Sequence, residues 1–290
     1  MNASPRPEVH GLFDAATSTI SYVVADPATG ACAVIDPVLD FDLRAGRLSS
    51  ASADALAGFV RDRALRPQWI LDTHVHADHV TALAHLRDRL GGTTGIGAHV
   101  TEIQETFREF YSAAPEFAAD GSQFDHLFED GETFAVGAIP ARVMHIPGHT
   151  PACVAYVIGD AVFTGDALLM PDFGTARCDF PGGDARALYR SVRRLLDLPG
   201  ETRMFVGHDY GPGGRPIAWE TTVAAQRTGN IHIRDGVSEE MFVALRTERD
   251  ATLDLPALML AAVQVNMRAG RLPPADRNGV SYLKIPVSRA

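Results

Sequence analysis

Residues 73–79 read THVHADH and come just after the apolar run QWIL. In an extended segment, side chains two apart point the same way, so His74 and His76 can converge just past a strand end. Asp78 and His79 begin the following turn and can face the same space from the other side. Imidazole and carboxylate are ligands of first-row metals. A polar helix N-terminus with surface histidines is the alternative, and this dense pattern disfavours it.

Three more polar side chains follow or join apolar strands further along the chain. His149 lies in the turn HIPGHTPAC, Asp166 ends VFTGD, and His208 ends MFVGH. Binding groups of layered α/β proteins collect at such strand ends. Any one of them alone is an ordinary strand-end residue. Together with THVHADH they predict a metal centre.

The rest of the chain mixes strands and helices in both halves. TISYVVAD and ACAVIDPV predict one hairpin, and ACVAYVIGDAVFTGD predicts another. Helices are expected at 184–197 and near 217–228, 238–249 and 256–268. This order indicates two facing sheets with helices outside, an α/β/β/α layering. We place a boundary near residue 210, between a core of residues 1–210 and a mostly helical extension of residues 211–290 packed on the same domain.

Composition narrows the function classes. The formal net charge of −10 disfavours nucleic acid as a partner. No apolar run approaches the ~20 residues of a membrane span, and the N-terminus lacks the pattern of a secretory signal, so we expect a cytoplasmic protein. The three cysteines are odd in number and far apart, which predicts free thiols. We interpret Cys153 and Cys178 as packing residues and not as nucleophiles.

THVHADH with the later GHT, TGD and GHD resembles the metallo-β-lactamase superfamily across roughly residues 10–210. That family has the αββα sandwich of two facing mixed sheets. The longer string PGHTPACVAYVIGDAVFTGDALLMPDFGTARCDF, with GHDYGPGG and QVNMR, is similar to the glutathione persulfide dioxygenases, also called sulfur dioxygenases. The tail NIHI…VNMR…YLKIP is similar to bacterial members.

The resemblance implies two metal arrangements built from the same side chains. In persulfide dioxygenases a single Fe(II) per chain sits on His74, His149 and Asp166, which would be the catalytic residues. The groups that would orient ligands and water around it are His76, Asp78, His79 and His208. In the zinc hydrolases the same set holds two ions, on His74, His76 and His149 and on Asp78, His79 and His208, with Asp166 bridging. Spacing does not separate the two, and zinc can also occupy the site in a purified sample.

The resemblance also implies a substrate, glutathione persulfide, which O2 oxidises to sulfite and glutathione. An acidic protein needs a local cation to hold glutathione carboxylates, and arginine binds them bidentately. By resemblance Arg177 and Tyr210 line that site, with Asp179 positioning Arg177, and Lys284 is a further candidate. We expect a homodimer, as in many relatives.

Two alternatives stand beside the iron-dependent persulfide dioxygenase. The first is a dinuclear zinc thioesterase of the glyoxalase II kind, which shares the glutathione substrate. The second is a non-catalytic metal-binding protein that keeps the fold, and the intact ligand positions disfavour it.

Overall fold

Strand β2 (Thr19–Ala25) is buried along its whole length and serves two different cores. Ile20 and Tyr22 pack between the two main sheets, whereas Val23 on the opposite face packs toward helices. A strand covered on both faces carries apolar residues on both of them instead of alternating. This explains the run Tyr22–Ala25, YVVA, which has no polar residue facing solvent.

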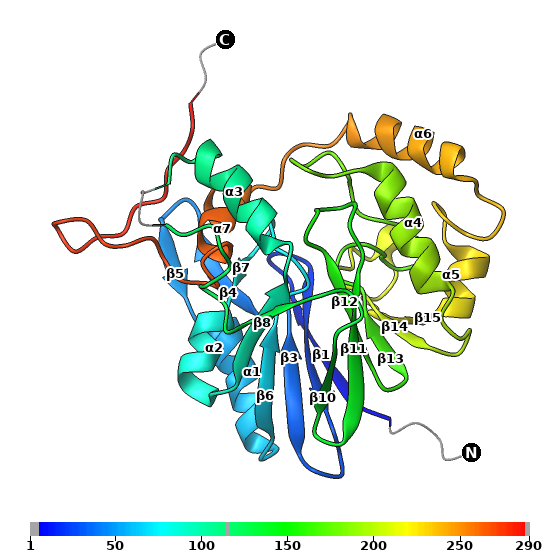
Figure 1. Cartoon of the computed structure of the whole chain (residues 1–290), viewed down its shortest axis with the longest axis horizontal. Coiled ribbons are helices and arrows are strands. Elements are labelled where there is room, and N and C mark those ends of the chain that lie inside the picture. Colours follow the sequence, from blue (N-terminus) through cyan, green and yellow to red (C-terminus); the bar gives the residue numbers. More distant parts are fainter. Residues whose placement is uncertain (1–5, 114–116, 288–290) are drawn as a thin grey trace.

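Two six-stranded sheets face each other in the computed structural model, which describes residues 6–113 and 117–287 (Figure 1). The first sheet has the order β1-β2-β3-β6-β8-β9. Its other strands are β1 (Glu8–Asp14), β3 (Ala31–Ile35), β6 (Arg66–Leu71), β8 (Thr93–Gly97) and β9 (His126–Phe128). The second sheet runs β10-β11-β12-β13-β14-β15. Its strands are β10 (Thr133–Val136), β11 (Ile139–His145), β12 (Val154–Ile158), β13 (Ala161–Phe163), β14 (Arg203–Phe205) and β15 (Glu220–Thr222).

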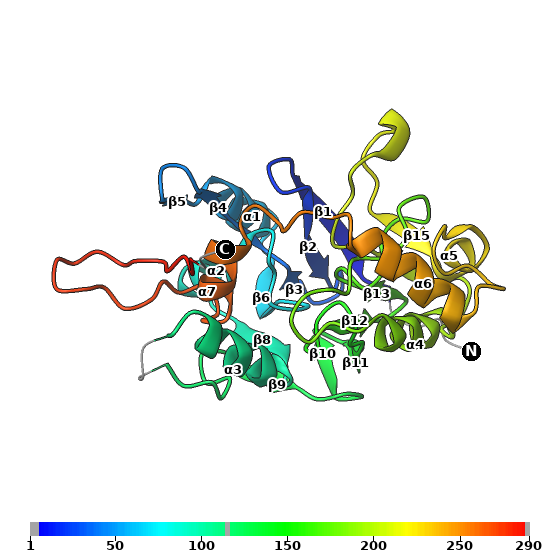
Figure 2. The same ribbon diagram turned by 90° about the horizontal axis from the view of Figure 1, so that it is seen from above.

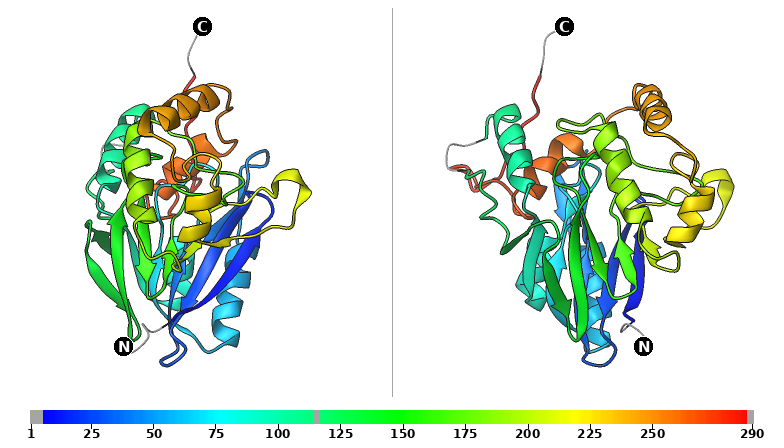
Figure 3. Two further views of the ribbon diagram at one scale, coloured as in Figure 1. Left: turned by 90° about the vertical axis from the view of Figure 1, so that its right-hand side faces the viewer. Right: turned by 45° about the vertical axis from the view of Figure 1, so that its right-hand side comes forward.

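Helices cover the outer face of each sheet (Figures 1 and 3). On the first sheet these are α1 (Ala51–Asp62), α2 (Leu83–Leu90), α3 (Val100–Phe110) and α7 (Met259–Asn266). On the second they are α4 (Ala185–Leu196), α5 (Val223–Gly229) and α6 (Glu239–Asp250). A small third sheet joins β4 (Val38–Asp42) to β5 (Arg47–Ser49) and β7 (Val80–Thr81). The expected αββα sandwich is confirmed, and both main sheets mix parallel and antiparallel pairs.

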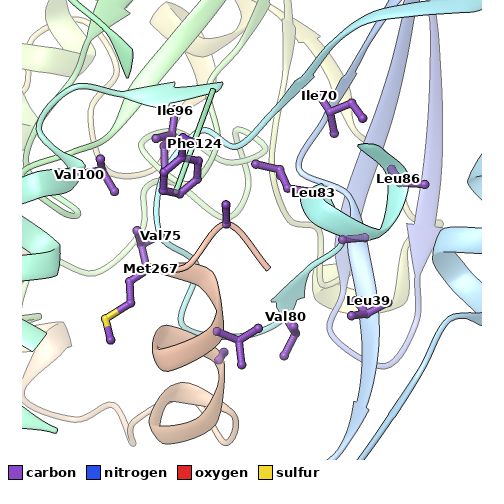
Figure 4. Packing of buried hydrophobic residues seen from close by; sticks show 14 of the residues in the cluster. Leu39, Ile70, Val75, Val80, Leu83, Leu86, Ile96, Val100, Phe124 and Met267 are labelled. Atoms are coloured by element: carbon purple, nitrogen blue, oxygen red, sulfur yellow. The ribbon is translucent and has the colours of Figure 1, made fainter. Parts of the chain in front are cut away.

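Three apolar cores hold these layers together, one under each helical layer and one between the sheets. Figure 4 shows part of the core under the first helical layer. There Val75, from the THVHADH segment, belongs to the same cluster as Met267, which directly follows α7. The segment that carries the predicted metal ligands is thereby packed against the C-terminal part of the chain.

Residues beyond 210 contribute to the second main sheet and to both helical layers. β15 pairs with β14 at the edge of the second sheet, α6 packs on α4, and α7 packs on β7. The helix expected near 217–228 is shorter, because Glu220–Thr222 is a strand and the Thr222 hydroxyl then caps α5. The tail SYLKIPV is extended but joins no sheet in the described residues. The Gln264 side-chain amide donates to the Lys284 carbonyl and accepts from the Lys284 N–H.

Figure 2 shows the two helical layers on either side of the paired sheets, with residues 271–285 projecting from one end as an extended arm. Among the described residues, no helix combines the length and the apolar character needed to cross a membrane.

Candidate metal centre and adjoining cavity

The sheet topology brings four of the predicted ligands to one edge. β13 and β14 are parallel, so their carboxyl ends meet there, and Asp166 and His208 follow these two strands. β12 runs antiparallel to β13, so the turn before β12, which carries His149, lies at the same edge. His74 arrives from the end of β6 in the facing sheet. The edge between the two sheets therefore collects these polar side chains.

His74, His149 and Asp166 form one compact group, with one ligand atom of each within 4.8 Å of the others. The Asp166 carboxylate oxygen Oδ2 lies 3.8 Å from His74 Nε2 and 3.7 Å from His149 Nε2. All three residues are buried. Two imidazoles and one carboxylate at this spacing can hold a first-row metal ion and leave coordination positions open.

Hydrogen bonds on the far side of each ring fix which nitrogen faces the group. His149 Nδ1 lies 2.7 Å from the carbonyl oxygen of Arg177, which can only accept, so Nδ1 carries the proton and Nε2 keeps its lone pair. His74 Nδ1 contacts the Thr73 hydroxyl, which is itself held by Asp36. Such outer contacts orient metal-binding imidazoles.

A second group shares Asp166 and adds Asp78 and His208. His208 Nε2 lies 3.2 Å from Asp166 and 3.3 Å from Asp78, and its Nδ1 donates to the Ser18 carbonyl. Burial lowers the pKa of His208, but the two carboxylates outweigh it and raise that pKa to about 10. His79 stands next to Asp78, at 3.2 Å. This group could hold a second ion.

His76 differs from the expectation that it converges with His74. The two rings are close, at 4.1 Å between centroids, but His76 Nε2 is turned onto Asp36 at 3.0 Å. The reason is local: residues 73–79 form a bent turn and not a strand, so the two-residue alternation does not apply. His76 forms one group with Asp36 and Asp72, two buried carboxylates that sequence reasoning did not single out, and a second group with Asp78 and His79.

Three buried ring nitrogens of the predicted ligands have no hydrogen-bond partner among the described residues. They are His74 Nε2, His76 Nδ1 and His79 Nε2. An unpartnered buried polar atom costs about 1–3 kcal/mol, so three in one place need a common explanation. A bound divalent cation would satisfy atoms of this type, and the residues present fit such a group.

Two glycines allow the strand ends to approach this closely. Gly165 has φ +49°, and a Cβ there would lie 2.4 Å from the Thr73 hydroxyl. A Cβ on Gly207 would lie 2.7 Å from Asp166 Oδ1. The glycines of TGD and VGHD are thus required by the packing around Asp166.

Asn266, near the end of α7, clamps the THVHADH turn. Its amide nitrogen donates to the carbonyls of His76 and His79, at 2.8 and 2.7 Å, and its oxygen accepts from the Thr81 N–H. The residue is 1% exposed. Sequence reasoning missed it, because the contact joins positions about 190 residues apart.

Arg177 lines the cavity beside the metal ligands, but most of its donors are already used. Four of its five N–H donors are used within the protein, by the Asp179 carboxylate and by the carbonyls of Leu253 and Asp254. The guanidinium therefore both fastens the segment after α6 and lines the cavity beside the metal ligands. The pairing with Asp179 does agree with the sequence expectation.

Helix α6 holds both ends of the short segment that contains Arg177. Arg246, buried and ion-paired with Asp250, donates to the Thr175 carbonyl, and Asp250 accepts from the Cys178 N–H. The Arg177 carbonyl between these two anchors is the one that orients His149. The helix of the C-terminal extension is thereby linked to a metal-binding ring.

A cavity of about 460 Å³ opens beside both groups and includes Asp78, His149, Asp166 and His208 in its wall. Tyr210 also lines it, half exposed, with its ring 4.7 Å from that of Phe173. The volume suits a small organic ligand.

Lys284 does not reach this cavity. It lines a separate hollow between α7 and the C-terminal arm, where its ammonium donates to the Ser112 carbonyl. The structure thus brings the seven predicted metal-site residues, Arg177 and Tyr210 to one place, whereas Lys284 lies elsewhere.

Comparison with known proteins places this site in a family. The profile of the metallo-beta-lactamase superfamily matches residues 16–208. A probable metallo-hydrolase of Burkholderia pseudomallei is 56% identical over 96% of this chain and 98% of its own length. Glyoxylase B2 of Dictyostelium discoideum is 45% identical over 99% of both chains.

Persulfide dioxygenases are more distant relatives. The human mitochondrial persulfide dioxygenase ETHE1 is 31% identical over 89% of this chain and 87% of its own. The crystal structure of ETHE1 from Myxococcus xanthus superposes with a TM-score of 0.72 at 33% identity, covering 91% of this chain and all of that one. The chain belongs to the metallo-beta-lactamase superfamily.

Proposed function

We propose that the protein is a persulfide dioxygenase that holds one Fe(II) on His74, His149 and Asp166. The observation that carries this proposal is the compact group made by one ligand atom each of His74, His149 and Asp166, a group that does not include His76. Two imidazoles and a carboxylate are the set that non-heme iron oxygenases use. The similarity to ETHE1 proteins supports the same assignment.

The proposed substrate is glutathione persulfide. Glutathione persulfide, O2 and water give glutathione, sulfite and two protons, so the terminal sulfur loses four electrons and O2 gains them. When bound, an Fe(II) ion with open positions can bring the sulfur and O2 together. No protein nucleophile is needed.

The chain's own residues hold and shield the site. The Arg177 carbonyl and the Asp36–Thr73 pair fix the two imidazoles. Phe180 lies against His149, at 5.3 Å between rings, and limits water on that side. Tyr210 offers a hydroxyl in the cavity wall.

A dinuclear zinc thioesterase that cleaves glutathione thioesters is the second candidate. The group formed by Asp78, Asp166 and His208 favours it, because a second ion there would complete the two-metal arrangement that activates water. The similarity to a protein named glyoxylase B2 points the same way.

Oxygen uptake separates the two candidates. Anaerobically purified protein, loaded with Fe(II), is given glutathione persulfide in an oxygen-electrode cell, and sulfite is measured. We expect one O2 consumed per sulfite formed. Release of free thiol from S-lactoylglutathione by zinc-loaded protein, with no O2 uptake in the iron form, would establish the thioesterase instead.

A further inference from the structure

Three arginines line the cavity beside the metal groups: Arg177, Arg246 and Arg249. Arg177 is paired with Asp179, and Arg246 is buried and paired with Asp250. Arg249, in the last turn of α6, is exposed and forms no ion pair within the described residues. It is therefore the arginine of this wall whose charge is available to a ligand.

The surroundings of Arg249 connect it to the metal groups. Its guanidinium lies 5.8 Å from the centre of the Phe173 ring, Phe173 lies 4.7 Å from Tyr210, and Tyr210 stacks 6.1 Å from His208. A row of rings thus leads from the metal-binding histidine to this cation. Two aromatic rings stand between Arg249 and the metal-binding His208. Arg249 therefore serves to hold a ligand and does not take part in the reaction.

The same cavity is also lined by a carboxylate, Asp254, whose charge is opposite to that of Arg249. The backbone of Asp254 is pinned because its carbonyl accepts from Arg177, while its exposed side chain lines the cavity and forms no ion pair in residues 6–113 and 117–287. A cation and an anion, both unpaired and both facing one cavity, match a ligand that carries both charges. An α-amino acid end, with its carboxylate and ammonium, is such a ligand.

We propose that Arg249 and Asp254 form a subsite for the zwitterionic α-amino-acid end of the thiol carrier, with Arg249 binding its carboxylate and Asp254 its ammonium. This inference rests on the proposed function, because it assumes that the substrate is the persulfide of such a thiol carrier. It assigns the binding of the ligand carboxylate to Arg249 of α6 and not to Arg177, whose donors bond mostly to Asp179 and to backbone carbonyls. Persulfides without this end would bind the metal groups but not the subsite.

The test compares two substrates in the iron-loaded full-length protein. Arg249→Gln should raise the KM for glutathione persulfide roughly 5- to 20-fold, the range for losing one exposed charge-assisted contact, with kcat nearly unchanged. For the persulfide of 2-mercaptoethanol, which lacks the amino-acid end, kcat/KM should change less than about twofold. Arg108→Gln on α3 removes the same charge far from the cavity and should alter neither substrate.

Direct binding separates this inference from the proposed function. Calorimetric titration with glutathione itself, which needs no turnover, should show weaker binding in both Arg249→Gln and Asp254→Asn than in the parent protein. If glutathione binds the variants and the parent equally, the subsite is wrong even where persulfide oxidation is observed. If the parent oxidises no persulfide but glutathione binding still depends on Arg249, the subsite stands and the proposed function falls. A KM that rises equally for both persulfides would show a structural effect of Arg249 and would also refute the subsite.

Discussion

Replacing Asn266 by Ala tests whether α7 holds the metal-binding turn in place. The change removes two hydrogen bonds donated to the carbonyls of His76 and His79 and one accepted from Thr81. At roughly 1 kcal/mol net for each bond, the free energy of unfolding should fall by about 3 kcal/mol. Because the turn carries the ligands, iron affinity should also fall, by the roughly 10- to 100-fold seen for contacts that support metal ligands.

Gln264→Ala is the matched control on the same helix. Gln264 is also a buried amide with three hydrogen bonds, to Leu260 and to both backbone groups of Lys284, but it holds the C-terminal arm. Its removal should cost a similar free energy of unfolding and leave iron affinity unchanged. The measurements are urea denaturation and iron retention against a competing chelator. Equal iron retention in the two variants would refute the clamp.

Three further predictions concern single side chains. Asp166→Ala or His74→Ala should abolish iron binding and turnover, whereas His76→Ala should retain about one iron per chain. Elemental analysis checks the iron content, and loss of the iron in His76→Ala would contradict the three-residue site. Burial raises the pKa of Cys32, Cys153 and Cys178 to about 12, so at pH 8 the native thiols should not react with Ellman's reagent, and all three should react after unfolding. Burial, aided by Arg246, lowers the pKa of His232 to about 4, so the unfolded state binds more protons and stability is lost as the pH falls from about 6.5 toward 4. The free energy of unfolding should change by at most about 1.4 kcal/mol per pH unit. Measured by urea titration, the difference in free energy of unfolding between the parent protein and His232→Asn should become smaller as the pH falls. A difference that does not change with pH argues against a neutral native His232.

The ligands that follow apolar strands could be predicted from the sequence, because a strand end fixes where its next residues lie. Asp166 and His208 are of this kind, and the parallel pairing of β13 with β14 brings them together. Asp36 carries the same signal, since it ends the apolar strand β3, and sequence reasoning overlooked it.

Contacts made across the chain could not be predicted in this way. Asn266 reaches the THVHADH turn only because α7 packs on β7. Arg177 lines the cavity and pairs with Asp179 as expected, but its bonds to the carbonyls of Leu253 and Asp254, 76 and 77 residues away, could not be predicted. Lys284 depends on how the C-terminal arm folds back, for which the sequence holds no periodic pattern.

One iron held by three side chains is the centre of this account, and anomalous diffraction tests it most directly. Crystals grown anaerobically with Fe(II) should show a single peak at the iron absorption edge, bonded to His74 Nε2, His149 Nε2 and Asp166. Two peaks, with the second bonded to Asp78, His79 and His208, would contradict it.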